Sequence, residues 1–139
     1  MVELLDALHL PLVNRFYKSC RYSAKAGRGE QVFVLREKGA IKAALRLVPK
    51  PDSFRFLRSM CVAPECRRQG LGLRLLQEIE TDLDRSPLYC FPFDHLQSFY
   101  ETIGFEMRSP DDVPAFIRDP FNAYVRQGKK ILSMTRQAA

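Results

Sequence analysis

Hydrophobic and polar positions follow a helical period most clearly between residues 71 and 83. The apolar residues there lie three or four apart, and the stripe they form is Leu71, Leu75, Leu76, Ile79 and Leu83. This spacing predicts an amphipathic helix with one buried face, which Pro87 would end. A second helix is expected from an N-cap at Asp94 to a stop at Gly104. The first twenty residues also show helical spacing.

Shorter runs rich in β-branched and aromatic residues predict β-strands. These runs are 31–36, 41–48, 53–62, 88–91, 105–108 and 131–135. In the third run the alternation breaks after Leu57, which a β-bulge would explain. Between the last two runs, residues 110–128 predict a partly helical segment interrupted by Pro114 and Pro120. Strands that first run together and then alternate with helices indicate a mixed α/β fold, which we expect to form one domain over residues 1–139.

Composition narrows the class of protein. The chain has 22 Lys and Arg against 16 Asp and Glu, a net charge of +6 that is spread along the sequence. Such a surplus attracts polyanions, so phosphorylated ligands and nucleic acid both fit. Because the basic residues are not packed into one tract, the evidence for nucleic acid is weak. The four cysteines form no CxxC pair and the two histidines lie far apart, so we expect no metal site. No apolar run is long enough to span a membrane, and we expect a soluble, cytoplasmic protein.

The stretch "RRQGLG", residues 67–72, stands between the 53–62 strand and the amphipathic helix. A helix N-terminus presents unpaired N–H groups at the positive end of the helix dipole, so it attracts anions. Gly70 and Gly72 would let a phosphate approach the main chain, while Arg67 and Arg68 add cationic donors. The stretch fits neither the Walker pattern nor the dinucleotide fingerprint. It predicts a ligand that carries a pyrophosphate.

These six residues match every fixed position of the Arg/Gln-x-x-Gly-x-Gly/Ala signature of the GNAT superfamily of N-acetyltransferases, which the sequence resembles. A second motif, "SFYETIGF" at residues 98–105, is similar to the family segment that closes the helix after strand 5. Both motifs stand in the family's order and spacing, over roughly residues 31–105. The resemblance implies the GNAT fold, a mixed central sheet of about six strands flanked by helices and splayed between strands 4 and 5.

The resemblance also implies acetyl-CoA as cosubstrate, lying in the gap between those two strands, and no metal. Its pantetheine would pair with the backbone of the 53–62 strand, the family's strand 4, at Met60, Cys61 and Val62. Its pyrophosphate would lie in a cradle made of Arg67, Arg68, Gln69, Gly70, Leu71 and Gly72. The N–H of Val62 would lie near the thioester oxygen.

In this family a neutral amine attacks the acetyl carbonyl directly, in a ternary complex. Tyr100 matches the family's general acid, which protonates the departing thiolate, although its place on a buried stripe also fits a core aromatic. A base is harder to assign, because Asp52, in a turn, is the only carboxylate between residues 40 and 62. Asp94 fits an N-cap better than a base, and His95 is a possible base because histidine titrates near neutral pH.

One position departs from the family pattern. Many members have a cofactor-contacting Asn seven residues before the Tyr, and Phe93 stands there in this chain, so Asp94 or Ser98 would have to make that contact. Cys61 and Cys66 flank the region and are expected to pack rather than react. Arg55 and Arg58 are expected to be solvated on their strand, and the alternative for Arg58 is contact with an acidic acceptor.

Three functions stay open. The first is an acetyltransferase acting on a primary amine of a small molecule or a protein. The second is a regulatory domain that binds acyl-CoA without turnover, motivated by Phe93 and by the missing strand carboxylate. The third is a transferase acting on aminoacyl-tRNA, motivated by the net charge of +6. A homodimer is a further possibility, since family members commonly dimerise.

Overall fold

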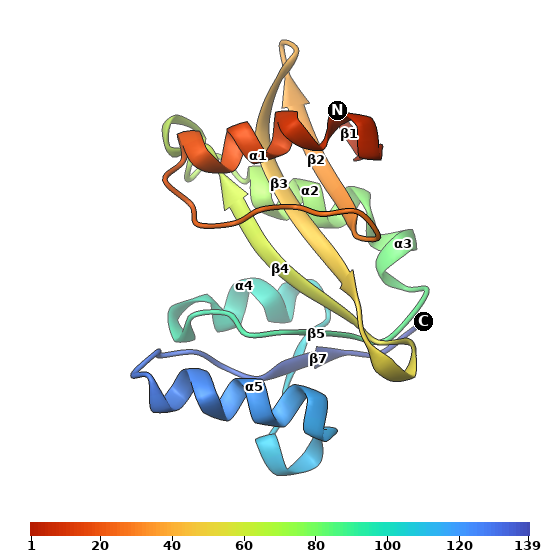
Figure 1. Ribbon diagram of the computed structural model, residues 1–139, viewed down its shortest axis with the longest axis vertical. Helices are drawn as coiled ribbons and strands as arrows, with labels where there is room; N and C mark the ends of the chain where they lie inside the picture. Colours follow the sequence, from red (N-terminus) through yellow and green to blue (C-terminus); the bar gives the residue numbers. More distant parts are fainter.

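The computed structural model describes all 139 residues, and its centre is a seven-stranded mixed sheet (Figure 1). The strands are β1 (Val2–Leu5), β2 (Gln31–Glu37), β3 (Ala40–Pro49), β4 (Arg55–Val62), β5 (Leu88–Cys90), β6 (Glu106–Met107) and β7 (Met134–Arg136). They lie in the order β1-β2-β3-β4-β5-β7-β6, and all neighbours are antiparallel except β4 and β5. The mixed α/β fold expected from the sequence is confirmed.

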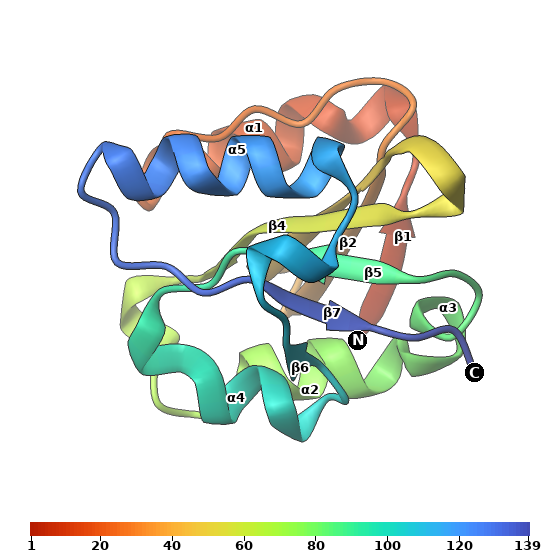
Figure 2. The same ribbon diagram turned by 90° about the horizontal axis from the view of Figure 1, so that it is seen from below.

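Helices cover both faces of this sheet. They are α1 (Leu10–Ser19), α2 (Leu71–Glu78), α3 (Glu80–Leu83), α4 (Gln97–Thr102) and α5 (Ala115–Arg126). Figure 2 shows α1 and α5 on one face and α2 and α4 on the other. The main core includes Leu45 and Leu57 of the sheet and Leu75 and Leu76 of α2, each at most 2% exposed. Burying each of these side chains contributes roughly 1.5–3 kcal/mol, which fixes α2 to the sheet.

The parallel strands β4 and β5 part soon after they meet. They pair only at Arg55 with Leu88 and at Phe56 with Tyr89. Beyond these two pairs β4 continues alongside β3, whereas β5 stays with β7, so the two halves of the sheet diverge (Figure 1). The splay expected between strands 4 and 5 is therefore present. It leaves one backbone edge of β4 without a partner strand from Leu57 onward.

A β-bulge bends β4 where it leaves β5. Ala44 pairs with Cys61 and Arg46 with Arg58, so two residues of β4, Ser59 and Met60, oppose one residue of β3. Ser59 has a φ of 60°, in the left-handed region. The bulge predicted from the broken alternation after Leu57 is confirmed.

Side chains from α1, from β3 and from the loop before β2 hold this bulge. The Tyr17 hydroxyl of α1 donates to the Ser59 carbonyl at 2.8 Å, and the Arg46 guanidinium donates to the Ser59 hydroxyl at 3.0 Å. The same guanidinium donates to both carboxylate oxygens of Glu30, at 2.8 and 2.7 Å. The bulge is thus tied to a buried ion pair and to α1.

Several expected elements are wrong in detail. Residues 2–5 form the strand β1 rather than the start of a helix, because they pair with β2, and this raises the strand count from about six to seven. The amphipathic helix breaks at Ile79, with φ −103° and ψ 14°, into α2 and α3. Pro120 lies inside α5 without interrupting it.

Two expected side-chain roles are also wrong. Asp94 caps no helix with its side chain, because a short 3-10 turn at Asp94–Leu96 precedes α4. Arg55 is not solvated: it donates to Asp82 Oδ1 at 2.6 Å, to Gln31 and to Ser86. The Arg55–Asp82 pair ties the start of β4 to α3. Gly104 ends α4 with a φ of 96°, as predicted.

Candidate active site

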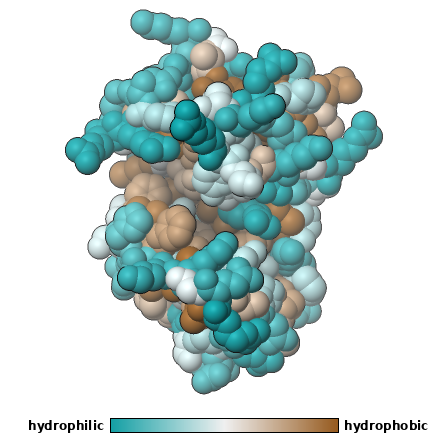
Figure 3. All heavy atoms as spheres, turned by 60° about the vertical axis from the view of Figure 1, so that its left-hand side comes forward, coloured by the Kyte–Doolittle hydropathy of each residue, from teal (hydrophilic) through white to brown (hydrophobic).

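A cavity of about 740 Å³ occupies the space between the diverging strands. It is lined by 22 residues, 14 of them hydrophobic, which come from β4, β5, α2, α4, α5 and the segments next to these elements and after α1. Figure 3 shows hydrophobic side chains gathered in a hollow on this side of the molecule, with hydrophilic side chains around it. The cavity is therefore a largely apolar cleft that opens through the splayed part of the sheet.

The unpaired edge of β4 presents backbone groups to this cleft. Ala63 donates its N–H to the Lys42 carbonyl at 2.8 Å, toward β3. Because successive residues of a strand direct their N–H and C=O groups to opposite edges, the N–H and C=O of Val62 point into the cleft. The Arg67 guanidinium donates to the Val62 carbonyl at 3.3 Å, which agrees with this orientation. The Val62 N–H is then a free donor between β4 and β5.

Met60, Cys61 and Val62 all line the cleft, where the sequence predicted the pantetheine site. Cys61 is buried, and burial raises the pKa of its thiol to about 12, with Cys20 nearby adding to the rise. A thiol with such a pKa stays protonated at neutral pH and is a poor nucleophile. Cys66 is buried in the main core. The expectation that both cysteines pack rather than react agrees with this placement.

The turn between β4 and α2 leaves the start of α2 bare. Gly70 is the N-cap residue, with a φ of 76°, and no side chain caps the helix. The first-turn N–H groups therefore have no partner within the helix. Arg67, Arg68 and Gln69 are exposed around this helix end, whereas Leu71 is buried in the core. Leu71 therefore offers the turn a backbone N–H but no accessible side chain.

Gly72 is constrained by space rather than by backbone conformation. A Cβ built on it would lie 2.9 Å from Met60 Cε, 3.5 Å from Phe99 and 3.6 Å from Val62. The absent side chain thus allows the first turn of α2 to pack directly against the residues that line the cleft. Gly70, in contrast, has open space around it and requires glycine for its left-handed φ.

Tyr100 lines the cleft from α4, opposite β4. It is 5% exposed, and its ring packs edge-on against Phe99 and Phe105 at centroid distances of 5.0 and 5.7 Å. Burial raises the pKa of its hydroxyl well above the usual range, and Cys90 and Tyr22 raise it further. Tyr100 is therefore both a core aromatic and a cleft residue, and it keeps its proton at any physiological pH.

His95 lies at the rim of the same cleft, and its side chain is 72% exposed. Its ring stacks on Phe93 at a centroid distance of 6.0 Å, and its Nδ1 is 4.0 Å from Asp94 Oδ1. Phe93 also lines the cleft, but Asp94 and Ser98 do not. The structure therefore brings neither of these two residues to the position where Phe93 replaces the Asn of many relatives.

Five of the nine residues predicted to bind the cosubstrate line the cleft, together with both predicted catalytic residues. The remaining four, Arg68 to Leu71, form the turn beside it. The sequence reasoning missed cleft residues outside the two motifs, among them Phe91, Tyr124 and Lys129, which no motif marked. Arg58, which the sequence suggested as an alternative contact for an acidic acceptor, also lines the cleft.

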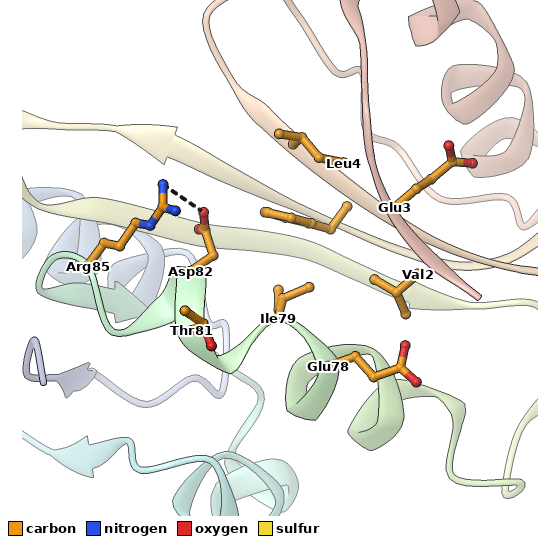
Figure 4. A pocket seen from close by; sticks show the side chains of 9 residues that line it. Val2, Glu3, Leu4, Glu78, Ile79, Thr81, Asp82 and Arg85 are labelled. Atoms are coloured by element: carbon orange, nitrogen blue, oxygen red, sulfur yellow. Dashed lines mark ion pairs between the residues drawn. The ribbon is translucent and has the colours of Figure 1, made fainter.

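A second, smaller pocket of about 320 Å³ lies away from these residues (Figure 4). Val2 and Leu4 of β1 form one side, and Ile79 and Asp82 near α3 form the other. Asp82 pairs there with Arg85 at 3.9 Å. None of the predicted site residues lines it. No group of three or more His, Cys, Asp or Glu side chains is placed to bind a metal ion, and no helix is long and apolar enough to cross a membrane.

Comparison with known sequences gives one family. The family model of the acetyltransferase (GNAT) domain matches residues 28–107, which is more than half of the chain. This range contains β2 to β6, the turn before α2, and the Tyr100 motif. Among curated proteins, no sequence matches significantly.

Solved structures of acetyltransferases are similar in fold. Ribosomal-protein-S18-alanine N-acetyltransferase from Escherichia coli gives a TM-score of 0.71 at 17% identity, over 100% of this chain and 94% of that one. Tetrahymena GCN5 gives 0.68 at 15% identity, over 100% and 96%. N-acetylglutamate synthase from Neisseria gonorrhoeae, solved with coenzyme A and N-acetyl-glutamate, gives 0.68 at 15% identity, over 100% and 35%. This chain spans about a third of the length of that synthase.

Proposed function

Because the chain belongs to the GNAT acetyltransferase domain family, we propose that it transfers an acetyl group from acetyl-CoA to a primary amine in the β4–β5 cleft. One observation carries the proposal: the unpaired backbone edge of β4 leads directly to the bare N-terminus of α2. Acyl-CoA has the two matching parts, since its pantetheine amides pair with a strand edge and its pyrophosphate suits a helix N-terminus.

We assign the pyrophosphate to the turn from Arg67 to Gly72. Its N–H groups would donate to phosphate oxygens at the positive end of the α2 dipole, and the exposed Arg67 and Arg68 would add charge-assisted bonds. The pantetheine would lie along β4 at Met60, Cys61 and Val62. These residues fit the group because the strand edge is unpaired and because glycine at position 72 leaves room beside Met60.

The reaction would be a direct displacement. The amine nitrogen bonds to the thioester carbonyl carbon, and the carbonyl oxygen gains a negative charge that the free N–H of Val62 would stabilise. The tetrahedral intermediate formed in this way then collapses. The amide forms, the carbon–sulfur bond breaks, and the electron pair leaves on sulfur. The sulfur then takes a proton from the Tyr100 hydroxyl, the amine loses one proton to water or to His95, and a proton from water restores the Tyr100 hydroxyl.

The raised pKa of Tyr100 bears on its role as the acid. A hydroxyl with a higher pKa is a weaker acid in water, but the departing thiolate is desolvated in the same cleft. Desolvation raises the proton affinity of the thiolate as well as that of the tyrosinate, so burial by itself does not widen the pKa difference between the two groups. Burial also ensures that Tyr100 is protonated throughout the pH range of the reaction.

Release of CoA thiol from acetyl-CoA, measured over a panel of amines, peptides and aminoacyl-tRNA, tests this function. Amine-dependent release supports it, and Arg67→Gln and Arg68→Gln should raise KM for acetyl-CoA more than they lower kcat. Exposed Arg126, which is not a cleft residue, provides the matched control as Arg126→Gln. Tight CoA binding without release for any acceptor would refute catalysis.

A second function follows if catalysis is refuted. No aspartate or glutamate lines the cleft, so no carboxylate is placed to accept the amine proton. This observation favours the alternative in which the domain binds acyl-CoA and regulates a partner. A reaction confined to aminoacyl-tRNA and weakened by salt would instead support the third possibility, because phosphate contacts are salt-sensitive.

A further inference from the structure

Apart from His95, the charged side chains that line the cleft are Arg58, Arg67 and Lys129, and all three are cations. Arg67 bonds to the Val62 carbonyl beside the α2 N-terminus, where the proposed function uses it. Arg58 and Lys129 form no ion pair and no side-chain hydrogen bond. No anion of the protein therefore pairs with these two cations of the cleft, and the proposed cosubstrate site does not use them.

These two cations lie at the ends of a strip of aromatic rings, Phe56, Phe91 and Tyr124, which also line the cleft. The ring centroids of Phe56 and Phe91 are 5.1 Å apart, and those of Phe91 and Tyr124 are 6.2 Å apart. The Arg58 guanidinium lies 5.2 Å from the Phe56 centroid, and the Lys129 ammonium lies 4.7 Å from the Tyr124 centroid. The aromatic strip is therefore an apolar row of rings inclined to one another, with a cation beside the ring at each end.

The aromatic strip faces away from the phosphate turn. Phe56 packs in a separate small core with Val113 and Ile117, next to α5, and Phe91 contacts Phe121 of α5 at 5.5 Å. Helices α5 and α2 cover opposite faces of the sheet (Figure 2). A pyrophosphate at the start of α2 therefore lies on the other side of the sheet from the strip. The strip is left for the second substrate.

We infer that the acceptor amine also carries an anionic group, a carboxylate or a phosphate, which one of the two cations, Arg58 or Lys129, binds at its end of the aromatic strip, and an apolar part that lies over the strip. This inference rests on the proposed acetyl transfer. Cations attract the anion, and no carboxylate in the cleft competes for them. A polycationic amine would instead lose its hydration beside like charges without a compensating partner.

Acceptors that differ only in the anion test this inference through thiol release. Phenylalanine is compared with phenylalaninamide, O-phosphoethanolamine with ethanolamine, and spermidine serves as the polycation. We expect at least one anionic member to exceed its uncharged partner about tenfold in kcat/KM, which corresponds to one charge-assisted contact. The phenylalanine and phosphoethanolamine arms separate a carboxylate from a phosphate. Preference for the uncharged members or for spermidine would overturn the inference.

Variants tie the preference to the two cations. Either Arg58→Gln or Lys129→Gln, whichever removes the cation that binds the anion, should lower kcat/KM for the anionic acceptor about tenfold, mainly through KM, and reduce its preference over the uncharged partner. Lys130→Gln is the matched control, because Lys130 is the exposed neighbour of Lys129 and does not line the cleft. An unchanged preference in both variants would contradict the assignment.

A binding measurement separates this inference from the proposed function. The CoA-saturated protein is titrated calorimetrically with N-acetylphenylalanine, with its amide and with O-phosphoethanolamine. If an anionic probe binds, Arg58→Gln or Lys129→Gln weakens that binding, and no amine is turned over, then catalysis is refuted but the anionic ligand class stands. If uncharged amines are turned over and neither anionic probe binds, then the proposed acetyl transfer stands and the inference of an anionic acceptor is refuted.

Discussion

Glu30→Ala should destabilise the protein by about 3–5 kcal/mol, although Glu30 lies outside both sequence motifs. Its carboxylate accepts two bonds from Arg46, and the two side chains are only 13% and 9% exposed. Removing the carboxylate leaves the Arg46 guanidinium buried with only the Ser59 hydroxyl as an acceptor. Because Ser59 belongs to the β4 bulge, we also expect the variant to bind CoA more weakly.

Urea unfolding followed by circular dichroism measures this loss as a shift of the midpoint at constant m-value. Glu106→Ala is the matched control: Glu106 pairs with Arg108 at 3.0 Å, but its side chain is 66% exposed, so its loss should cost less than about 1 kcal/mol. Adding Arg46→Met to Glu30→Ala should recover part of the stability, because no unpaired charge then remains. A Glu30→Ala variant within about 1 kcal/mol of the wild type would refute the reasoning.

The other predictions concern the same cleft and the same ion pair. Gly72→Ala should weaken CoA binding about tenfold by calorimetry, because its methyl would push Met60 Cε toward the cleft. Gly70→Ala should cost about 1 kcal/mol in urea unfolding, since its φ of 76° disfavours a Cβ. Burial raises the pKa of Glu30, but its bonds to Arg46 and to the Gly27 N–H outweigh this and lower it overall. Its contribution to stability should therefore be present above the unfolded pKa of about 4.3 and be lost as pH falls through the lower folded pKa, which urea midpoints between about pH 3 and 6 would show. Cys61→Ala should keep acetyl transfer in the thiol-release assay, because the protonated Cys61 is no nucleophile.

Local patterns of hydrophobic residues in the sequence were sufficient to predict the buried face of a helix and the position of a β-bulge. The stripe from Leu71 to Leu83 produced a buried helical face, and the broken alternation after Leu57 marked the bulge. The break at Ile79 was not visible, because the hydrophobic spacing continues through it. A pattern of side chains records which face is buried and says less about where a helix bends.

Long-range pairing decided the elements that were wrong. Leu4 and Leu5 fit a helical turn as well as a strand, and only pairing with β2 makes the segment β1. Pro120 would end an isolated helix, yet α5 continues through it, with Ile117 and Phe121 packed against the sheet. Tertiary packing outweighed local preference in both segments.

In the candidate site, too, local sequence motifs predicted some residues, and the others are brought together only by the fold. The turn at 67–72 and the motif at 98–105 predicted one edge of the cleft, because each is a run of consecutive residues that can be recognised in the sequence. The other edge combines Arg58 of β4 with Tyr124 and Lys129 from around the end of α5. These residues are far apart in the chain and carry no shared spacing. Only the folded sheet shows that they line one cavity.

Thiol release by the wild type and by Tyr100→Phe, with and without an amine, tests acetyl transfer in this cleft most directly. We predict amine-dependent release by the wild type, and a rate at least about 100-fold lower in the variant with unchanged affinity for CoA, as expected for loss of a general acid. The unchanged affinity would show that the cleft still binds its ligand. No amine-dependent release by the wild type, or equal rates for both proteins from pH 6 to pH 9, roughly the range in which the thiolate gains its proton, would contradict the account.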